Sequence, residues 1–177
     1  MSSWQNLVPV KRRNEGLLYA ADLGDLTEIA VEICDITPGQ MKTEDGLQQT
    51  GLVYFWNKKE GKAREKRLAL NATNRDALFH LFGANFWEAV GWVVLRKDMT
   101  EITDRKTKKR LRKECLRINL SRPKPDKYPP SFDYAENVKK RTEVALSKGW
   151  TSNKKIEPIE LVDVTEDPED SDVTEDP

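Results

Sequence analysis

The chain has 177 residues, 37% hydrophobic and 34% charged, and its 30 basic side chains balance 30 acidic ones. This size and composition are typical of a single modest domain with a strongly charged surface, and they exclude a large enzyme with a deep interior. No apolar run approaches the roughly 20 residues of a membrane-spanning helix, and residues 1–19 lack the apolar stretch of a signal peptide. We therefore expect a cytoplasmic protein.

The residues that usually bind metals are few. Cys34 and Cys115 lie far apart and in no C-x-x-C motif, and His80 is the only histidine. This pattern favours reduced thiols over a disulfide framework, and it excludes a zinc site built from cysteine and histidine. We therefore expect no metal and no cofactor.

The charges are divided unevenly along the chain. Residues 157–177 carry ten acids and no base, so the other 156 residues carry 30 bases against 20 acids, a net charge of +10. A basic body is typical of proteins that bind polyanions, although a basic globule with a solubilising tail has the same composition. In the tail, Asp163–Pro168 recurs as Asp172–Pro177, and because so little of it is apolar we expect it to be disordered.

Alternating or short apolar runs after a lead-in over residues 1–25 predict five strands. Polar residues predict a loop over Thr37–Thr50 and a turn over Asn57–Gly61. The charged stretch Arg96–Glu114 is expected to join the fourth strand to the fifth as a long loop. In chain order the five strands are Thr27–Ile36, Leu52–Trp56, residues 65–71, Val90–Leu95 and Leu116–Leu120.

Two helices are predicted. The first starts at Thr73, whose hydroxyl suits an N-cap, and stops at Gly83, which suits the residue after a helix. The second lies in a segment that stops at Gly149, and before it come four prolines that predict an extended linker. The expected organisation is a lead-in, a main domain, a linker, a helix and a disordered acidic tail, over residues 1–25, 26–121, 122–130, 131–150 and 151–177.

The order of three strands, a helix and two strands predicts a mainly β fold of the OB type. An OB-fold is a five-stranded barrel that binds oligonucleotides on its second and third strands and in the loops that join strands 1–2 and 4–5. We therefore expect an OB-like barrel over residues 26–121 with a helix between strands 3 and 4. A small α+β sheet of another topology is the alternative.

Two segments carry a resemblance. The run Leu68–Gly83 contains Leu-Asn-Ala-Thr-Asn before a helix that ends at glycine, and Trp87–Leu95 continues it as a strand. Together they resemble a family of small phage and prophage proteins. The resemblance implies a compact β domain, a phage or prophage origin, a bacterial host cell, and a place among replication and recombination functions. It supplies no catalytic motif.

Catalysis has little support in the sequence. Neither the phosphate-binding pattern G-x-x-x-x-G-K-[ST] nor the nucleophile pattern G-x-S-x-G occurs, so we expect a protein that is not an enzyme. An acidic cluster has the ligand chemistry for Mg²⁺, but Glu28 and Glu32 are expected on the solvated face of the first strand, which favours a solubilising role. The cluster consists of Asp22, Asp25, Glu28, Glu32 and Asp35.

Nucleic-acid binding has better support. Residues 96–124 carry 12 bases and four acids, a net charge of +8. Such a segment repels itself unless anions are near, and binding of phosphates with release of counterions is its natural use; an exposed basic hairpin without a partner is the alternative. The basic candidate residues are Arg105, Lys106, Lys108, Lys109, Arg110, Arg112, Lys113 and Arg117.

Aromatic residues of the second strand indicate the kind of nucleic acid. Exposed rings bind single strands by stacking on the bases. If Val53 and Phe55 face the core, then Tyr54 and Trp56 face the groove where OB-folds bind. In the opposite register Phe55 is the exposed ring, and all of these rings are core residues if the strand is buried on both faces.

These features lead to two hypotheses of different kinds. The first is non-specific binding of single-stranded DNA in phage replication or recombination. The acidic tail resembles those of single-stranded-DNA-binding proteins in charge, and it would contact host or phage replication or recombination proteins, although it lacks a terminal aromatic residue. The second is a phage interaction module that inhibits or adapts a host protein, for example against a defence system.

Overall fold

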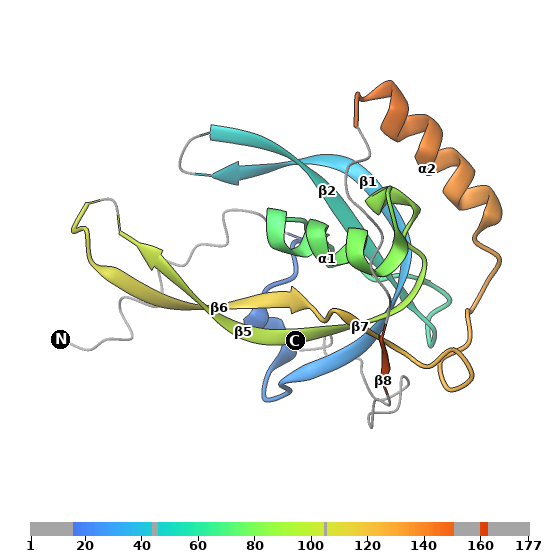
Figure 1. Cartoon of the computed structure of the whole chain (residues 1–177), viewed down its shortest axis with the longest axis horizontal. Coiled ribbons are helices and arrows are strands. Elements are labelled where there is room, and N and C mark those ends of the chain that lie inside the picture. Colours follow the sequence, from blue (N-terminus) through green and yellow to red (C-terminus); the bar gives the residue numbers. More distant parts are fainter. Residues whose placement is uncertain (1–15, 44–45, 105, 151–159, 163–177) are drawn as a thin grey trace.

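The computed structural model describes residues 16–43, 46–104, 106–150 and 160–162, and its main feature is an antiparallel sheet of six strands (Figure 1). Neighbouring strands follow the order β3–β2–β1–β5–β6, and β4 also pairs with β2. The strands are β1 (Glu28–Thr43), β2 (Gly46–Asn57), β3 (Lys62–Ala63), β4 (Leu68–Ala69), β5 (Gly91–Thr103) and β6 (Arg110–Ile118). The expectation of a mainly β fold is therefore confirmed.

The expected barrel is not closed by hydrogen bonds, which corrects the prediction. Within the described residues, no backbone ladder joins β4 to β6. Helix α1 (Ala72–Phe82) lies between β4 and β5 in the chain, and its Asn74 amide bonds the Leu116 carbonyl and the Ile118 N–H of β6, both at 3.0 Å. Backbone bonds between Gly16–Leu18 and Arg67 hold the other edge. Side chains and an N-terminal segment thus bridge the opening.

Two hairpins are much longer than the alternation of apolar residues predicts. The stretches expected as loops, Thr37–Thr50 and Arg96–Glu114, are mostly paired strand: the pairing extends to Thr43 opposite Gly46 in the first hairpin and to Thr103 opposite Arg110 in the second. We call residues 37–51 the β1–β2 arm and residues 96–117 the β5–β6 arm; both project on the same side of the molecule (Figure 1). A strand exposed on both faces has no buried face, so period-two alternation does not reveal it.

The core lies on one face of the sheet, which we call the inner face. It includes Ile33 and Phe55 from the sheet and Leu78 from α1, all less than 2% exposed. Val53 and Phe55 are buried there as the first register predicts. A smaller cluster lies on the opposite, outer face, where Trp92 packs against Tyr128.

The sequence predicted the position of α1 correctly but assigned its N-cap to the wrong residue. Asn71, and not Thr73, caps the helix, since its side-chain oxygen accepts a hydrogen bond from the Asn74 N–H at 2.8 Å. Gly83 ends the helix with a φ of 101°, as expected for that residue. The predicted turn over Asn57–Gly61 is confirmed by the bond from the Gly61 N–H to the Asn57 carbonyl at 2.8 Å.

The C-terminal part differs from the expectation at several points. The first residues of the expected linker belong to strand β7 (Ser121–Pro123). Helix α2 (Ala135–Ser147) begins four residues later than expected. Strand β8 (Glu160–Val162), in the segment predicted to be disordered, pairs in parallel with β7. The rest of the predicted tail and residues 1–15 lie outside the described residues. Two 3₁₀ helices, η2 (Ala20–Leu23) and η3 (Phe86–Glu88), complete the elements.

None of the helices described is both long and apolar enough to span a membrane.

Candidate nucleic-acid interface

The β5–β6 arm is a two-stranded ribbon whose register fixes the face of each side chain. Leu95 pairs with Ile118, both in the core, and the pairing continues without a bulge to Thr103 opposite Arg110. Because side chains alternate between faces along a strand, the arm divides its residues between the inner and outer faces. On the inner face lie Lys97, Met99, Glu101, Thr103, Arg110, Arg112 and Glu114; on the outer face lie Arg96, Asp98, Thr100, Ile102, Leu111, Lys113, Cys115 and Arg117.

The tip of the arm is a turn organised by Asp104. The Asp104 carboxylate accepts a hydrogen bond from the Lys106 N–H at 2.9 Å, and its carbonyl accepts one from the Lys108 N–H at 2.7 Å. Hydrogen bonds from backbone N–H groups, that of Lys106 first, hold the pKa of Asp104 below its ordinary value. The turn therefore keeps its single carboxylate ionised and bonded inward, while Lys106, Lys108 and Lys109 are exposed.

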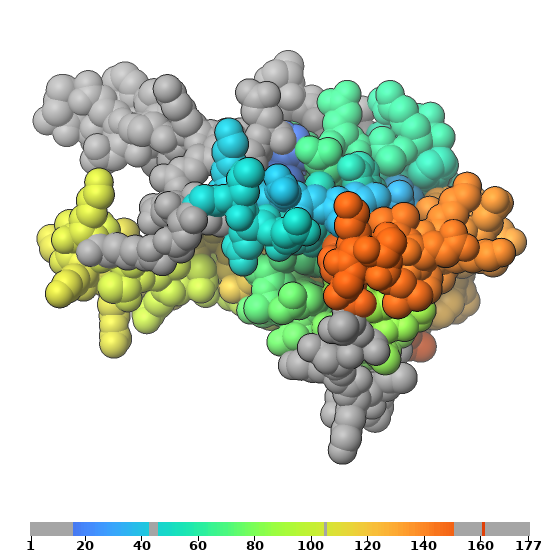
Figure 2. Space-filling view, turned by 90° about the horizontal axis from the view of Figure 1, so that it is seen from above, coloured from blue at the N-terminus to red at the C-terminus, as the bar shows by residue number. Residues whose placement is uncertain are grey.

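The structure separates the predicted basic residues into three groups. Lys106, Lys108 and Lys109 lie at the tip, and the remaining ones in β6 alternate between the two faces. Figure 2 shows the arm (yellow) at one end of the molecule, away from α2 (orange). Arg105 lies outside the described residues. The inner-face residues are Arg110 and Arg112, and the outer-face residues are Lys113 and Arg117.

The predicted aromatic residues of β2 lie on the outer face but are half-buried. The Trp56 ring lies 5.1 Å from that of Phe132, which comes from the segment before α2. The Arg67 guanidinium lies over the Tyr54 ring at 5.9 Å and donates a hydrogen bond to its hydroxyl at 3.3 Å. Both rings therefore already have intramolecular partners.

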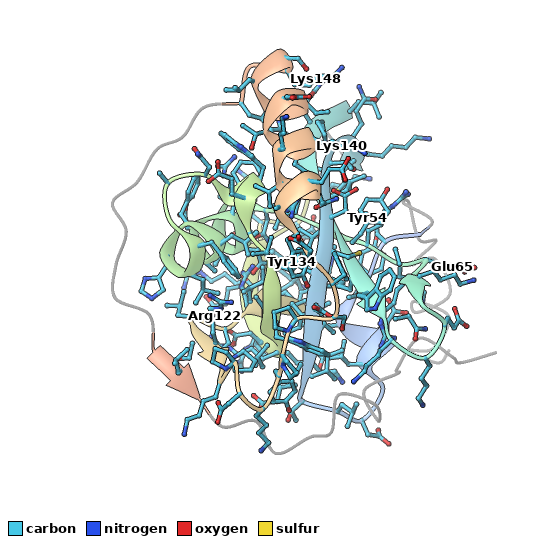
Figure 3. All side chains as sticks on the ribbon, turned by 90° about the vertical axis from the view of Figure 1, so that its right-hand side faces the viewer. Tyr54, Glu65, Arg122, Tyr134, Lys140 and Lys148 are labelled. Atoms are coloured by element: carbon cyan, nitrogen blue, oxygen red, sulfur yellow. The ribbon has the colours of Figure 1, made fainter. Side chains whose placement is uncertain are left out.

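The segment that carries Phe132 is held on the outer face by Glu32, which corrects the expectation that Glu32 is solvated. Glu32 is fully buried, and it accepts hydrogen bonds from the Ser131 N–H at 2.8 Å and from the Tyr134 hydroxyl. Tyr134 lies at the start of α2 beside β1 (Figure 3). Burial, together with its hydrogen bond to the Glu32 carboxylate, raises the pKa of Tyr134. The outer face of β1 is thus covered by the C-terminal part of the chain.

A buried arginine fixes α2 at the same place. The Arg141 guanidinium donates to the carbonyls of Trp87 at 2.8 Å and Ala89 at 2.9 Å, and it lies 3.7 Å from the Asp35 carboxylate. Sequence reasoning missed both Glu32 and Arg141 as buried residues. A buried charge must have partners, but those partners lie about 50 to 100 residues away, so no local pattern shows them.

The acidic residues considered for Mg²⁺ lie apart in the structure. Asp22 pairs with Lys66, Glu32 with Tyr134, and Asp35 with Arg141. Over the described ranges, no group of three or more histidine, cysteine, aspartate or glutamate side chains is arranged to bind a metal ion.

A pocket of about 420 Å³ lies at the base of the β1–β2 arm. Phe86 and Trp150 line it, with ring centroids 4.9 Å apart, and Arg75 of α1 is the charged residue among its described walls. Its walls come from β1, β2, α1, η3 and the two residues 149–150 after α2, and no local sequence pattern predicts that these segments meet.

Comparisons with protein-family models, with curated proteins and with solved structures find no match to this chain. The candidate interface therefore depends on its own geometry and charge.

Proposed function

We propose that the protein binds nucleic acid without sequence preference, with single-stranded DNA as a ligand. The observation that carries the proposal is the β5–β6 arm, which has ten bases against four acids over residues 96–117 and is exposed on both faces over residues 101–103 and 110–114. Exposed cations at this density bind phosphates and release counterions.

The sheet supports an OB-like interpretation of this function. If β1, β2, β4, β5 and β6 are taken as strands 1 to 5, α1 falls between strands 3 and 4. The two arms then stand where OB-folds have the loops that join strands 1–2 and 4–5, both of which contact oligonucleotides. In this arrangement the barrel is left open and is bridged by Asn74 and the N-terminal segment.

Stacking on Trp56 is a second, smaller part of the proposal. The ring centroids of Trp56 and Phe132 lie 5.1 Å apart on the outer face. A base can therefore stack on Trp56 at this place only if the Phe132 side chain moves aside. The basic arm therefore supplies most of the affinity, and phosphate contacts dominate over stacking. A phage role in replication or recombination is the context that we propose for this activity.

The test is a fluorescence-anisotropy titration of the full chain with fluorescein-labelled dT oligomers at several salt concentrations. We expect the logarithm of the binding constant to fall linearly with the logarithm of salt, by about 0.7 per phosphate contact for a single strand. Absence of binding at low salt contradicts the proposal and favours the interaction module instead.

A further inference from the structure

We propose that the β5–β6 arm enters the major groove of duplex DNA, with the side chains of Ile102 and Leu111 against the C5-methyl groups of thymine. This inference goes beyond single-strand binding and does not depend on it.

The dimensions of the arm suit a groove. Residues 97–103 form six steps of an extended strand, which at about 3.4 Å per residue make a ribbon about 20 Å long. The major groove of B-DNA is about 12 Å wide and admits a two-stranded β-ribbon. Residues 101–103 and 110–114 are exposed on both faces, so nothing in the described part of the chain covers the ribbon there.

An apolar pair lies at the distal end of the outer face. Ile102 and Leu111 are directly opposite each other in the register, and they are 43% and 45% exposed. Opposed side chains on one face of an antiparallel pair lie in contact range, so the two form one small apolar surface. An aliphatic surface of this kind fits the thymine methyl group, which only the major groove displays.

Charges around the pair identify the partner as a polyanion. Lys113 is the next outer-face residue of β6, and the tip lysines Lys106, Lys108 and Lys109 follow on the other side. Cations on both sides of an apolar surface suit a groove floor flanked by phosphates. A second copy of the arm is disfavoured as the partner, because it would bring two lysine-rich tips together.

The arm also has no aromatic side chain on which a base could stack. Residues 96–118 contain no phenylalanine, tyrosine or tryptophan. Single strands bind by stacking on aromatic rings, whereas duplex grooves are contacted by aliphatic side chains. The aliphatic and basic side chains of the arm therefore suit contact with a duplex groove, while the aromatic residues of β2 lie elsewhere on the sheet.

The test compares a fluorescein-labelled duplex rich in A·T pairs with the same duplex in which dU replaces dT, which removes only the methyl groups. We expect the full chain to bind the dT duplex at least about fourfold more tightly, the ratio that burial of one methyl group gives. The double variant Ile102→Ser, Leu111→Ser should bind both duplexes equally. Met99→Ser, which changes an exposed apolar residue on the inner face of the same arm, is the matched control and should keep the preference.

Three results would overturn the inference: no duplex binding at low salt, equal affinity of the unchanged chain for the two duplexes, or a preference that survives in the double variant. Circular dichroism and thermal unfolding of each variant confirm that the fold is intact. Binding of dT oligomers is measured in parallel, so failure of the duplex inference and failure of the proposed single-strand function give different results.

Discussion

The two arms have the same backbone architecture but differ in what surrounds them. The β1–β2 arm is anchored at its base, where the Thr50 hydroxyl bonds the Leu70 carbonyl at 2.6 Å and the Leu70 N–H bonds the Gly51 carbonyl at 2.9 Å. It also forms one wall of the pocket beside Trp150. The β5–β6 arm is also held at its base, where the Lys97 N–H bonds the Thr27 carbonyl at 2.8 Å and the Asn74 amide bonds the Leu116 carbonyl at 3.0 Å, but its residues 101–103 and 110–114 are exposed on both faces.

The two arms also differ in the charge of their side chains. The β1–β2 arm has one lysine and two acids, a net charge of −1, whereas the β5–β6 arm carries a net charge of +6. The few charges of the β1–β2 arm nearly cancel, and the arm has a structural explanation because its base packs against the rest of the fold. The mutually repelling charges of the β5–β6 arm have no such explanation, which supports the proposal that the arm binds a partner. The comparison thus favours the β5–β6 arm as the proposed interface.

The largest effect is expected from removing the charge of the β5–β6 arm. Replacing Lys106, Lys108, Lys109 and Arg110 by alanine should weaken binding of dT oligomers by about tenfold or more at low salt and reduce the salt slope by about three units. The charge-matched control replaces Lys58, Lys59, Lys139 and Lys140, which lie on other elements. If the control loses as much affinity as the arm variant, net charge and not the arm explains binding.

A substitution in the β1–β2 arm should instead change the free energy of unfolding. A methyl group added at Gly39 would lie 2.4 Å from Cδ1 of the buried Leu52, so Gly39→Ala should destabilise the fold by about 1–3 kcal/mol. Thr100→Ala on the β5–β6 arm should change stability by no more than about 0.5 kcal/mol. Urea denaturation measures both. An unaffected Gly39→Ala variant would show that Leu52 moves freely and that the β1–β2 arm is not packed.

Alkaline pH should lower the free energy of unfolding through Cys34, which lies in β1 before the β1–β2 arm. Burial raises the pKa of Cys34 from 9.0 to about 12, so its neutral form is favoured in the folded state. Because the folded pKa lies above the unfolded one, this stability is complete below pH 9 and is lost as pH rises toward 12. In urea denaturation between pH 8.5 and about pH 11, the free energy of unfolding should fall less steeply with pH for Cys34→Ala than for the unchanged chain. Tyr134 contributes at the upper end, so the loss does not vanish.

The smallest effect is expected where Phe132 covers Trp56. An aromatic pair contributes about 0.5–1.5 kcal/mol, so Phe132→Ala should strengthen binding of dT oligomers by about twofold to tenfold and increase quenching of tryptophan fluorescence. The double variant Trp56→Ala, Phe132→Ala should lose this gain. Unchanged affinity and fluorescence in Phe132→Ala would remove Trp56 from the binding surface.

Several features followed from the sequence because they depend on neighbours along the chain. The alternation of Val53 and Phe55 predicted their burial, Asn57–Gly61 predicted a turn, and Gly83 marked the end of α1. The excess of basic residues after position 96 identified the segment that we propose as the interface. Caps, turns and half-buried strands leave local patterns, since their causes lie within a few residues.

The burial of Glu32 and the structure of the β5–β6 arm depend on tertiary contacts. Glu32 alternates with apolar neighbours as a solvated residue does, yet Ser131 and Tyr134, about 100 residues later, cover it and donate hydrogen bonds to its carboxylate. The β5–β6 arm has no buried face beyond Leu116, so its strands carry no alternation, and only the pairing of β5 with β6 distributes its cations between two faces. Local periodicity records burial against a nearby core, whereas burial by distant segments and pairing in open solvent depend on contacts that only the folded chain makes.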